Sequence, residues 1–190
     1  MRLQGIVSRE VAATDAAVVT VGVLQAVTKE NVIPDEAIIK LNMRTFDAGV
    51  RQHVLAAIER IVNAEAEASG APRKPEITPL DRYPLNVNDE TARNRIVEAF
   101  RGYFSADRVK HTGPAPASED FGCFGTAWQV PSVFWFVGGT DPDIYAKAKE
   151  AHRLNELPVN HSPKFAPVIH PTLRTGVETL VVATRAWLPA

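Results

Sequence analysis

The feature that most constrains the fold is a strand-like segment that passes directly into a long amphipathic helix. Residues 36–46 alternate between apolar and polar side chains, which is the period of a strand with one buried face. Asp47 can then cap a helix that Gly70 ends. The apolar stripe of this helix comprises Val50, Val54, Ile58, Ile61 and Val62. The strand and the helix each have an apolar face to bury, so we expect the helix to pack on a sheet. This predicts a mixed α/β protein.

The rest of residues 1–81 extends this pattern. Residues 2–10 carry apolar side chains at helical spacing, and residues 18–27 are rich in Val and Thr, as strands are. Prolines punctuate an extended stretch at 72–79, which we interpret as a further strand. The predicted order is helix, strand, strand, helix, strand. With one more strand in front, this would be a ferredoxin-like sandwich whose sheet has one face covered by two helices.

The chain changes character over residues 81–88, so we assign residues 1–81 to one domain and 82–190 to another. Residues 89–104 predict an amphipathic helix, and residues 131–137 predict a strand buried on both faces. A last helix begins at Pro171. Its predicted core stripe is Leu173, Val177, Leu180, Val181 and Leu188. The second segment has too few strands for a whole domain.

Charge and cysteine content exclude several classes of protein. Lys and Arg number 21 against 22 for Asp and Glu, so the net charge of −1 gives no reason to expect a nucleic-acid partner. The single Cys123 cannot form an internal disulfide and excludes a thiolate zinc site within this chain, which favours a cytoplasmic location. No apolar run is long enough to span a bilayer.

Three polar residues are candidates for chemistry. His161 lies in Asn-His-Ser-Pro, where a proline stiffens a loop enough to present an imidazole to a metal, although a plain loop histidine would look the same. Arg44 can bind a carboxylate with its planar fork, or it can be a solvated strand residue. Asn31 can donate to a developing oxyanion, or it can simply form a turn.

Two further candidates concern backbone access and second-sphere support. Gly138 and Gly139 end the predicted buried strand, where glycines allow a ligand to approach the backbone but a tight turn would also need them. Glu119, in Ser-Glu-Asp-Phe, can support a metal ligand from behind. A helix cap by Ser118 explains the same stretch without a ligand.

Several ordered motifs together resemble the dinuclear metal-dependent amidohydrolases, which include aminoacylases, hippurate hydrolases and auxin-conjugate hydrolases. The resemblance runs along the whole chain, and several motifs at such spacing are more specific than any one. It rests on Leu3–Glu10, Asn31–Pro34, Asn42–Asp47, Ser118–Phe121, Val130–Gly139 and Asn160–Pro163.

The resemblance implies hydrolysis of the amide bond of N-acyl amino acids or small peptides. It implies two divalent metal ions, usually zinc and sometimes manganese, nickel or cobalt, in a catalytic domain with an inserted lid that mediates dimerisation. By position, His161 matches the last metal ligand, Arg44 the arginine that holds the substrate carboxylate, and Asn31 a lid residue that reaches the scissile carbonyl. Gly138 and Gly139 match the loop that lines the substrate pocket.

The departures from the family pattern are equally informative. The sequence contains no Cys-Gly-His-Asp motif, no Glu-Glu pair and no Gly-Gly-His motif, which in the family provide other ligands, the general base and the first lid strand. We therefore expect a lid without its first strand at residues 1–81 and the C-terminal part of a catalytic domain at 82–190. We expect the isolated chain to lack activity and to associate with itself or with a polypeptide that supplies the other half.

Three hypotheses remain open on the sequence. The chain is part of an amidohydrolase, as an expression fragment, a gene with a misassigned start or half of a split enzyme. Alternatively, the lid has become a non-catalytic module for dimerisation or small-molecule binding, since ferredoxin-like sandwiches host many binding functions. The third hypothesis is a degenerate gene product without function.

Overall fold

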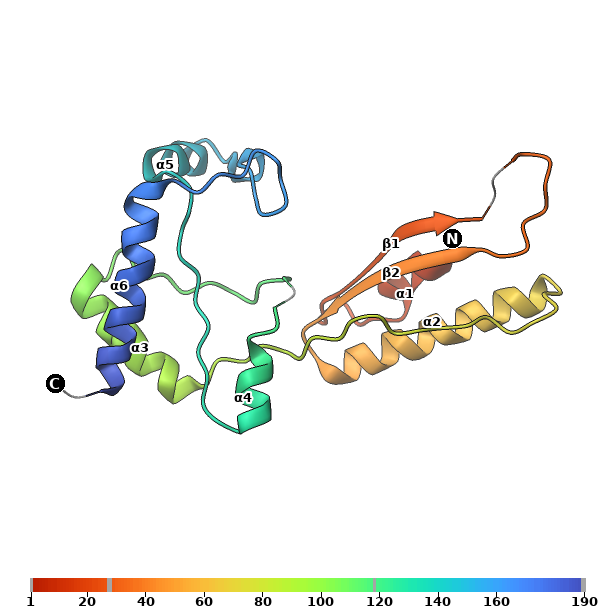
Figure 1. Ribbon diagram of the computed structural model, residues 1–190, viewed down its shortest axis with the longest axis horizontal. Coiled ribbons are helices and arrows are strands. Elements are labelled where there is room, and N and C mark those ends of the chain that lie inside the picture. The colour runs from red at the N-terminus through yellow and green to blue at the C-terminus, as the bar shows by residue number, and fades with distance from the viewer. Residues whose placement is uncertain (1, 27–28, 118, 189–190) are drawn as a thin grey trace. The chain divides into compact units, whose positions relative to one another are not determined.

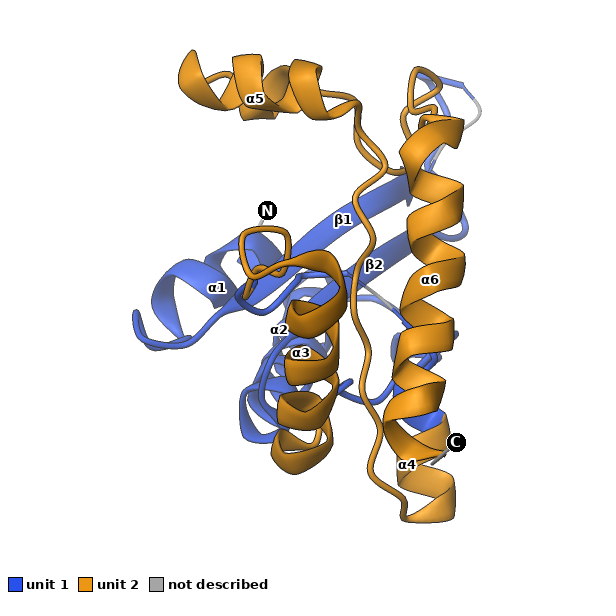
Figure 2. Ribbon diagram, turned by 90° about the vertical axis from the view of Figure 1, so that its left-hand side faces the viewer, with its two compact units in different colours: residues 1–86, 112–123 blue, residues 87–111, 124–190 orange. Residues whose placement is uncertain are grey.

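The computed structural model describes residues 2–26, 29–117 and 119–188 (Figure 1). The chain divides into two compact units (Figure 2). Residues 1–86 and 112–123 form the first unit, and residues 87–111 and 124–190 form the second. Helices and strands are mixed, so the predicted α/β class is confirmed. The assignment of residues 1–81 to a lid and 82–190 to a catalytic domain stays a prediction.

The first unit contains an antiparallel pair of strands, β1 (Ala17–Gln25) and β2 (Ile38–Thr45). The register runs from Ala17 opposite Thr45 to Gln25 opposite Ile38, with a bulge between Val21 and Val23. The bulge adds a residue at Gly22 and turns the strand locally. Both strands lie where the sequence predicted them, although the predicted end of the first, Val27, lies outside the described residues.

Helices cover one face of this hairpin. They are η1 (Arg2–Gln4), α1 (Gly5–Arg9) and α2 (Ala48–Ala68). Asp47 caps α2 by accepting a hydrogen bond from the Val50 amide at 2.9 Å, and Gly70 follows the helix at φ 65°, as predicted. The core between helices and strands comprises Leu3, Ile6, Val19, Val54, Ala57 and Ile58. The alternation of β2 and the stripe of α2 thus meet as the sequence required.

The predicted strand at 72–79 is wrong. Among the described residues, the sheet has two strands, and this stretch is extended without joining it. Pro72, Pro75 and Pro79 have no amide hydrogen, so the stretch offers few donors to a neighbouring strand.

The second unit is built around α3 (Glu90–Phe104) and α6 (Ile169–Trp187). Asp89 caps α3 with a 2.8 Å hydrogen bond from the Ala92 amide. The buried cluster comprises Ile96, Phe100, Phe104 and Ala183, with Val109, Val133, Trp135 and Val182 packed against it. The shorter helices are α5 (Pro142–Glu150) and η2 (Leu154–Glu156), and the greater part of α4 (Gly122–Trp128), whose first two residues belong to the first unit. None of the described helices is long and apolar enough to cross a bilayer.

Two predictions for the second unit are wrong. Residues 131–137 are extended but form no ladder among the described residues, and Phe136 is 61% exposed. On α6, the predicted core stripe is exposed, whereas Thr179 and Ala183 are buried. The predicted strand assumed a neighbouring sheet, and the described part of this unit contains no strand to provide it. Pro171 does begin the regular part of α6, because His170 before it has non-helical φ and ψ.

Candidate functional site

The predicted site residues fall in both units. Asn31, Arg44 and Glu119 belong to the first unit, and Gly138, Gly139 and His161 belong to the second.

Arg44 lies on the exposed face of β2, on the polar side of the alternation. Its Nε donates to Asn42 Oδ1 at 3.3 Å, and its Nη1 donates to the carbonyl oxygen of Pro116. A guanidinium has five N–H donors, so these two contacts orient the side chain and leave donors free for a carboxylate. The contact with Pro116 was not predictable from the sequence, because it joins segments far apart in the chain.

Asn31 lies in the turn between β1 and β2, and it is exposed. The Val32 amide beside it donates to the carbonyl oxygen of Lys29 at 3.3 Å, which closes the turn. Ile33 is 92% exposed.

Gly138 and Gly139 occupy different environments. A Cβ on Gly139 would lie 3.1 Å from Cβ of Pro167, so packing against this proline explains that glycine. A Cβ on Gly138 would meet nothing within 4 Å, so steric exclusion of a side chain does not explain the glycine at position 138. The Gly138 carbonyl accepts a hydrogen bond from Thr172 Oγ1 at 3.2 Å, and the Gly139 carbonyl accepts one from the Val168 amide at 2.9 Å. The glycine turn is thus fastened to the start of α6.

His161 is exposed and adopts a φ of 71°. The left-handed region is uncommon for a residue with a Cβ, although histidine is enriched there. The turn around it is closed by a hydrogen bond from the Ser162 amide to the Val159 carbonyl at 3.0 Å. Ser162 Oγ also accepts from the Lys164 amide at 3.2 Å. The loop that carries His161 ends at Val168, whose amide binds Gly139, so the histidine loop and the glycine turn share an anchor.

Glu119 makes local hydrogen bonds. Its Oε1 accepts from the amide of Asp120 at 2.9 Å and from that of Phe121 at 3.3 Å. This carboxylate therefore caps the turn before α4. Ser118, the predicted cap, lies outside the described residues.

The side chains that could bind a metal ion are scattered over the described residues. Within residues 2–26, 29–117 and 119–188, no three His, Cys, Asp or Glu side chains are grouped so that they could hold a metal ion. Structural and catalytic zinc sites need at least three protein ligands. The described residues therefore do not fit a metal centre by themselves, and His161 can only be one ligand of a larger set.

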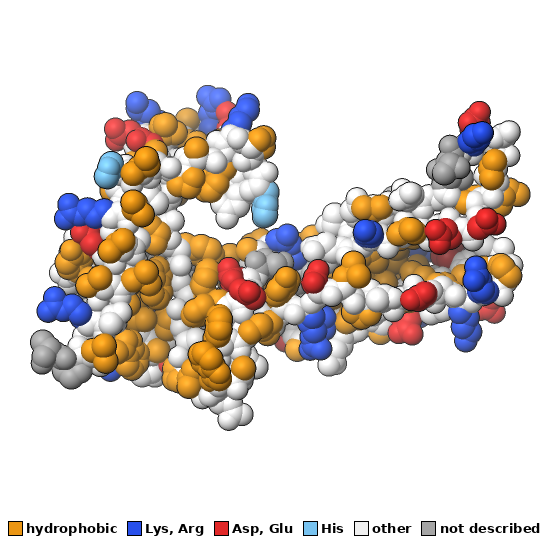
Figure 3. Space-filling model, in the orientation of Figure 1, with side chains coloured by type: hydrophobic (Ala, Val, Ile, Leu, Met, Phe, Trp, Pro, Cys, Tyr) orange, Lys and Arg blue, Asp and Glu red, His pale blue; other side chains and the backbone are white. Residues whose placement is uncertain are grey.

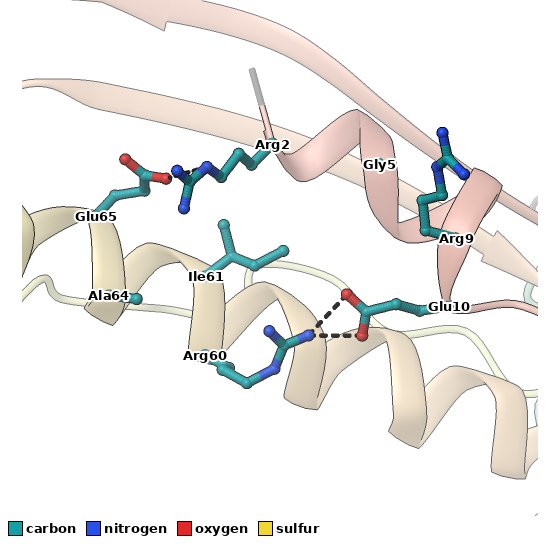
Figure 4. Close-up of a pocket in the computed structure, with 8 residues that line it drawn as sticks. All are labelled: Arg2, Gly5, Arg9, Glu10, Arg60, Ile61, Ala64 and Glu65. Carbon is teal, nitrogen blue, oxygen red and sulfur yellow. Dashed lines mark hydrogen bonds and ion pairs between the residues drawn. The ribbon is translucent and has the colours of Figure 1, made fainter.

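A charged groove of about 330 Å³ lies between α1 and α2 (Figure 4). Arg2 Nε lies 3.0 Å from Glu65 Oε1, and Arg60 Nη2 lies 2.6 Å from Glu10 Oε2. Sequence reasoning did not find these ion pairs, because their partners lie far apart in the chain. They join η1 and the C-cap of α1 to α2.

None of the known family models matches the sequence. Among curated proteins, the chain is 33% identical over 138 residues to an N-acetylcysteine deacetylase of Bacillus subtilis, which covers 72% of this chain and 34% of that protein. It is 33% identical over 123 residues to a hippurate hydrolase of Campylobacter jejuni, covering 64% of this chain and 32% of that protein. The chain thus spans about a third of the length of these relatives.

A solved structure from methicillin-resistant Staphylococcus aureus, provisionally described as an aminohydrolase, has the same fold. The TM-score is 0.65 at 24% identity, over 95% of this chain and 43% of that one.

Proposed function

Because this chain belongs to the amidohydrolase and peptidase family of hydrolases, we propose that it forms part of an enzyme that hydrolyses the amide bond of N-acyl amino acids. The relatives include an N-acetylcysteine deacetylase and a hippurate hydrolase. N-acetylcysteine and hippurate are both N-acyl amino acids. The observation that carries the proposal is the held position of His161. Its left-handed turn is anchored to the glycine turn through Val168.

We assign roles to the site residues on this basis. His161 serves as one metal ligand, because an imidazole in a strained, closed turn is presented in a fixed direction. Arg44 binds the carboxylate of the amino acid with donors that its contacts leave free. Asn31 polarises the scissile carbonyl. Gly138, where a Cβ would have open space around it, lines the substrate pocket together with Gly139.

The proposed reaction needs more metal ligands than these residues provide. When bound, two divalent ions, zinc or manganese or in some cases nickel or cobalt, would supply hydroxide near neutral pH. His161 alone does not complete the ligand set of either ion. We therefore propose that the isolated chain neither holds two ions tightly nor turns over substrate, and that further donors come from a polypeptide that completes the enzyme.

Two partners follow from this proposal. The first is a second copy of the chain, bound through residues 1–81. The other is a polypeptide that supplies the part of the relatives that this chain does not span. Because Cys123 is exposed as a free thiol, we also propose a reducing compartment, the cytoplasm.

The test is reconstitution. The chain is mixed with the part of the Bacillus subtilis deacetylase that it does not match, with zinc or manganese, and release of amino acids from acetyl, benzoyl and indoleacetyl conjugates is measured. His161→Ala should lower kcat/KM by more than about 100-fold, because losing a metal ligand should cost more than losing an outer-shell partner of a ligand, which costs about 10-fold to 100-fold. The matched control is His152→Ala, because His152 is also exposed, lies in the same unit and has a φ of 55°. Equal effects of the two substitutions would contradict the role of His161.

A second pair of variants tests Arg44. Arg44→Lys should raise KM about 10-fold to 100-fold for substrates with a free carboxylate, because lysine cannot bind a carboxylate with two parallel hydrogen bonds. The KM of Arg44→Lys for the corresponding amides, which lack the free carboxylate, should change little. Arg73→Lys, an exposed arginine of the same unit, is the control. An unchanged KM in Arg44→Lys would contradict substrate binding by this residue.

A further inference from the structure

The side chain of Asn88 forms with Phe134 the pair of hydrogen bonds that a residue of a neighbouring strand would form. Its Nδ2 donates to the carbonyl oxygen of Phe134 at 2.8 Å, and its Oδ1 accepts from the Phe134 amide at 2.7 Å. Two residues that face each other in an antiparallel ladder exchange the same two hydrogen bonds. The Asn88 carboxamide thus replaces a strand neighbour for Phe134, whose segment joins no sheet among the described residues.

The backbone next to Asn88 continues this attachment. The Asp89 amide donates to the carbonyl oxygen of Ser132 at 3.0 Å, and the Asp89 side chain caps α3 by accepting from the Ala92 amide. Asn88 is half-buried, so water competes less for its hydrogen bonds than it would at the surface. Two adjacent residues therefore connect the start of α3 to the extended segment at 131–137.

Apolar packing holds the same segment but does not fix its register. Val133 and Trp135 pack against the cluster between α3 and α6, and the rings of Trp135 and Phe100 have centroids 5.4 Å apart. Figure 3 shows further hydrophobic side chains on the surface of this unit, along α6. The hydrophobic effect has no direction, so these contacts tolerate a small shift of the segment. The carboxamide of Asn88 does not, because hydrogen bonds weaken steeply when distance and angle change.

The extended segment leads directly into the glycine turn. Within the described part of the chain, the amide and carbonyl groups of residues 135–137 make no hydrogen bond, so Phe134 is the last residue before the turn that is held in this way. On its other side the turn is fastened to the start of α6, because the Gly139 carbonyl accepts a hydrogen bond from the Val168 amide at 2.9 Å. The turn therefore lies between two anchors, of which Asn88 is one.

We propose that Asn88 is a positioning residue for the substrate pocket, because its carboxamide fixes the segment that leads into the glycine turn. The inference rests on the proposed function for the statement that this turn lines the pocket. In this role Asn88 contacts neither substrate nor metal. It acts through the backbone of the turn, and a displacement of about 1 Å at such a place is enough to weaken the fit of a substrate.

Hydrogen exchange of the whole chain, without metal or substrate, tests whether Asn88 holds the turn. Asn88→Asp keeps the shape of the side chain, but its carboxylate cannot donate to the Phe134 carbonyl. We expect the Val168 amide, which is bonded to the turn, to exchange about 10-fold faster. The amide of Phe100, which lies in the buried core of the same unit, should stay within about 2-fold. Unchanged exchange at Val168 would mean that Asn88 holds only its own segment, and the proposal would be overturned.

Asn94→Asp is the matched control. Asn94 is exposed on α3 in the same unit, and its side-chain oxygen accepts from the neighbouring Arg93, which a carboxylate can also do. The change of charge is the same, so equal acceleration of the Val168 amide by both variants would overturn the role of Asn88. Circular dichroism shows whether the variants are folded. If Asn88→Asp is not, Asn88→Ser, which adds no charge, takes its place.

Acidification separates the hydrogen bond from other effects of the substitution. A protonated carboxyl group has one donor and one acceptor oxygen, as the carboxamide has. Below about pH 4, the Val168 amide of Asn88→Asp should therefore regain its protection relative to the wild type. Asp89 and Glu90 titrate in the same range, and the control variant, which keeps both, gives the baseline. Failure to recover in a folded variant would contradict the hydrogen-bond explanation.

Kinetics distinguish this inference from the proposed function. In the enzyme reconstituted with the part of the Bacillus subtilis deacetylase that this chain does not match, Asn88→Asp should raise KM about 10-fold and change kcat less than about 3-fold. A lower kcat at unchanged KM would overturn a role in positioning the pocket. Absence of turnover in the reconstituted wild type would contradict the proposed function, whereas the exchange of the Val168 amide would still decide whether Asn88 holds the turn.

Discussion

Helices α2 and α6 are similar in length, yet only the predicted apolar stripe of α2 packs into a core. On α2, Val54 and Ile58 are buried against the hairpin and α1. On α6, the large side chains of the stripe are exposed, and the buried positions are the small residues Thr179 and Ala183. The difference shows that an apolar stripe predicts burial only when the element it needs lies in the same unit.

The largest effect should come from the core that is complete. Ile6 of α1 is fully buried against α2 and the hairpin, so Ile6→Ala should lower the free energy of unfolding by about 2–5 kcal/mol. Hydrogen exchange measured at increasing urea concentration should show that the loss of stability is confined to residues 1–86. If residues 87–111 lost protection equally, the two units would not be energetically separate.

The helix caps provide a comparison in which both units should behave alike. Asp47 and Asp89 accept hydrogen bonds from the amides of Val50 and Ala92, at 2.9 and 2.8 Å. Asp47→Ala and Asp89→Ala should each cost about 1 kcal/mol of the stability of their own unit, because a cap acts locally. Chemical denaturation of the single and double variants should give additive losses. A much larger cost in one unit would show that its helix depends on the cap rather than on packing.

The parts of the fold that could be predicted are those specified by local signals such as these caps. Asp47, Gly70 and the alternation of residues 36–46 are local signals, and α2 and β2 formed where they indicated. The predicted strands at 72–79 and 131–137 failed because a strand is defined by a neighbour, and the sequence of a segment does not show whether that neighbour is present. The exposure of the α6 stripe has the same cause.

The candidate site also combines features that the sequence indicated with features that only the structure shows. Motifs drew attention to Arg44 and His161, and their roles stay predictions. The contact of Arg44 with Pro116 and the left-handed conformation of His161 depend on how distant segments and whole turns fold, which residue types alone do not encode. The anchor at Val168, which ties the histidine loop to Gly139, had no signal in the sequence.

Leu180→Ser should have a smaller effect on the isolated chain than either cap variant. Because Leu180 is mostly exposed, the substitution should change the free energy of unfolding by less than about 0.5 kcal/mol. Binding of a dye for apolar surfaces should fall at the same time. Val54→Ser, at a fully buried position of α2, is the contrasting control and should destabilise strongly. A large loss in Leu180→Ser would mean that the stripe is already packed within this chain.

A smaller effect concerns a surface ion pair on α6. Arg174 Nε lies 2.7 Å from Glu178 Oε1, and this hydrogen bond lowers the pKa of Glu178 below its ordinary value. A carboxyl group whose pKa is lowered on folding contributes stability above its unfolded pKa, about 4.3, and this contribution is lost as the pH falls through the folded value. Glu178→Gln should therefore unfold slightly more easily than the wild type at pH 7, and the two midpoints should converge on acidification.

The pair Arg153 and Glu156 tests whether such a contact matters only within a packed unit. Its hydrogen bond likewise lowers the pKa of Glu156, but it lies within η2 and its N-cap. The helix η2 packs against α5, a helix without a buried residue. Glu156→Gln should shift the global unfolding midpoint less than Glu178→Gln does, because α5 and η2 can open locally without unfolding the α3 and α6 core. An equal shift in both variants at pH 7 would show that α5 unfolds together with that core, and the α6 stripe would then belong to a more cooperative unit than its exposure indicates.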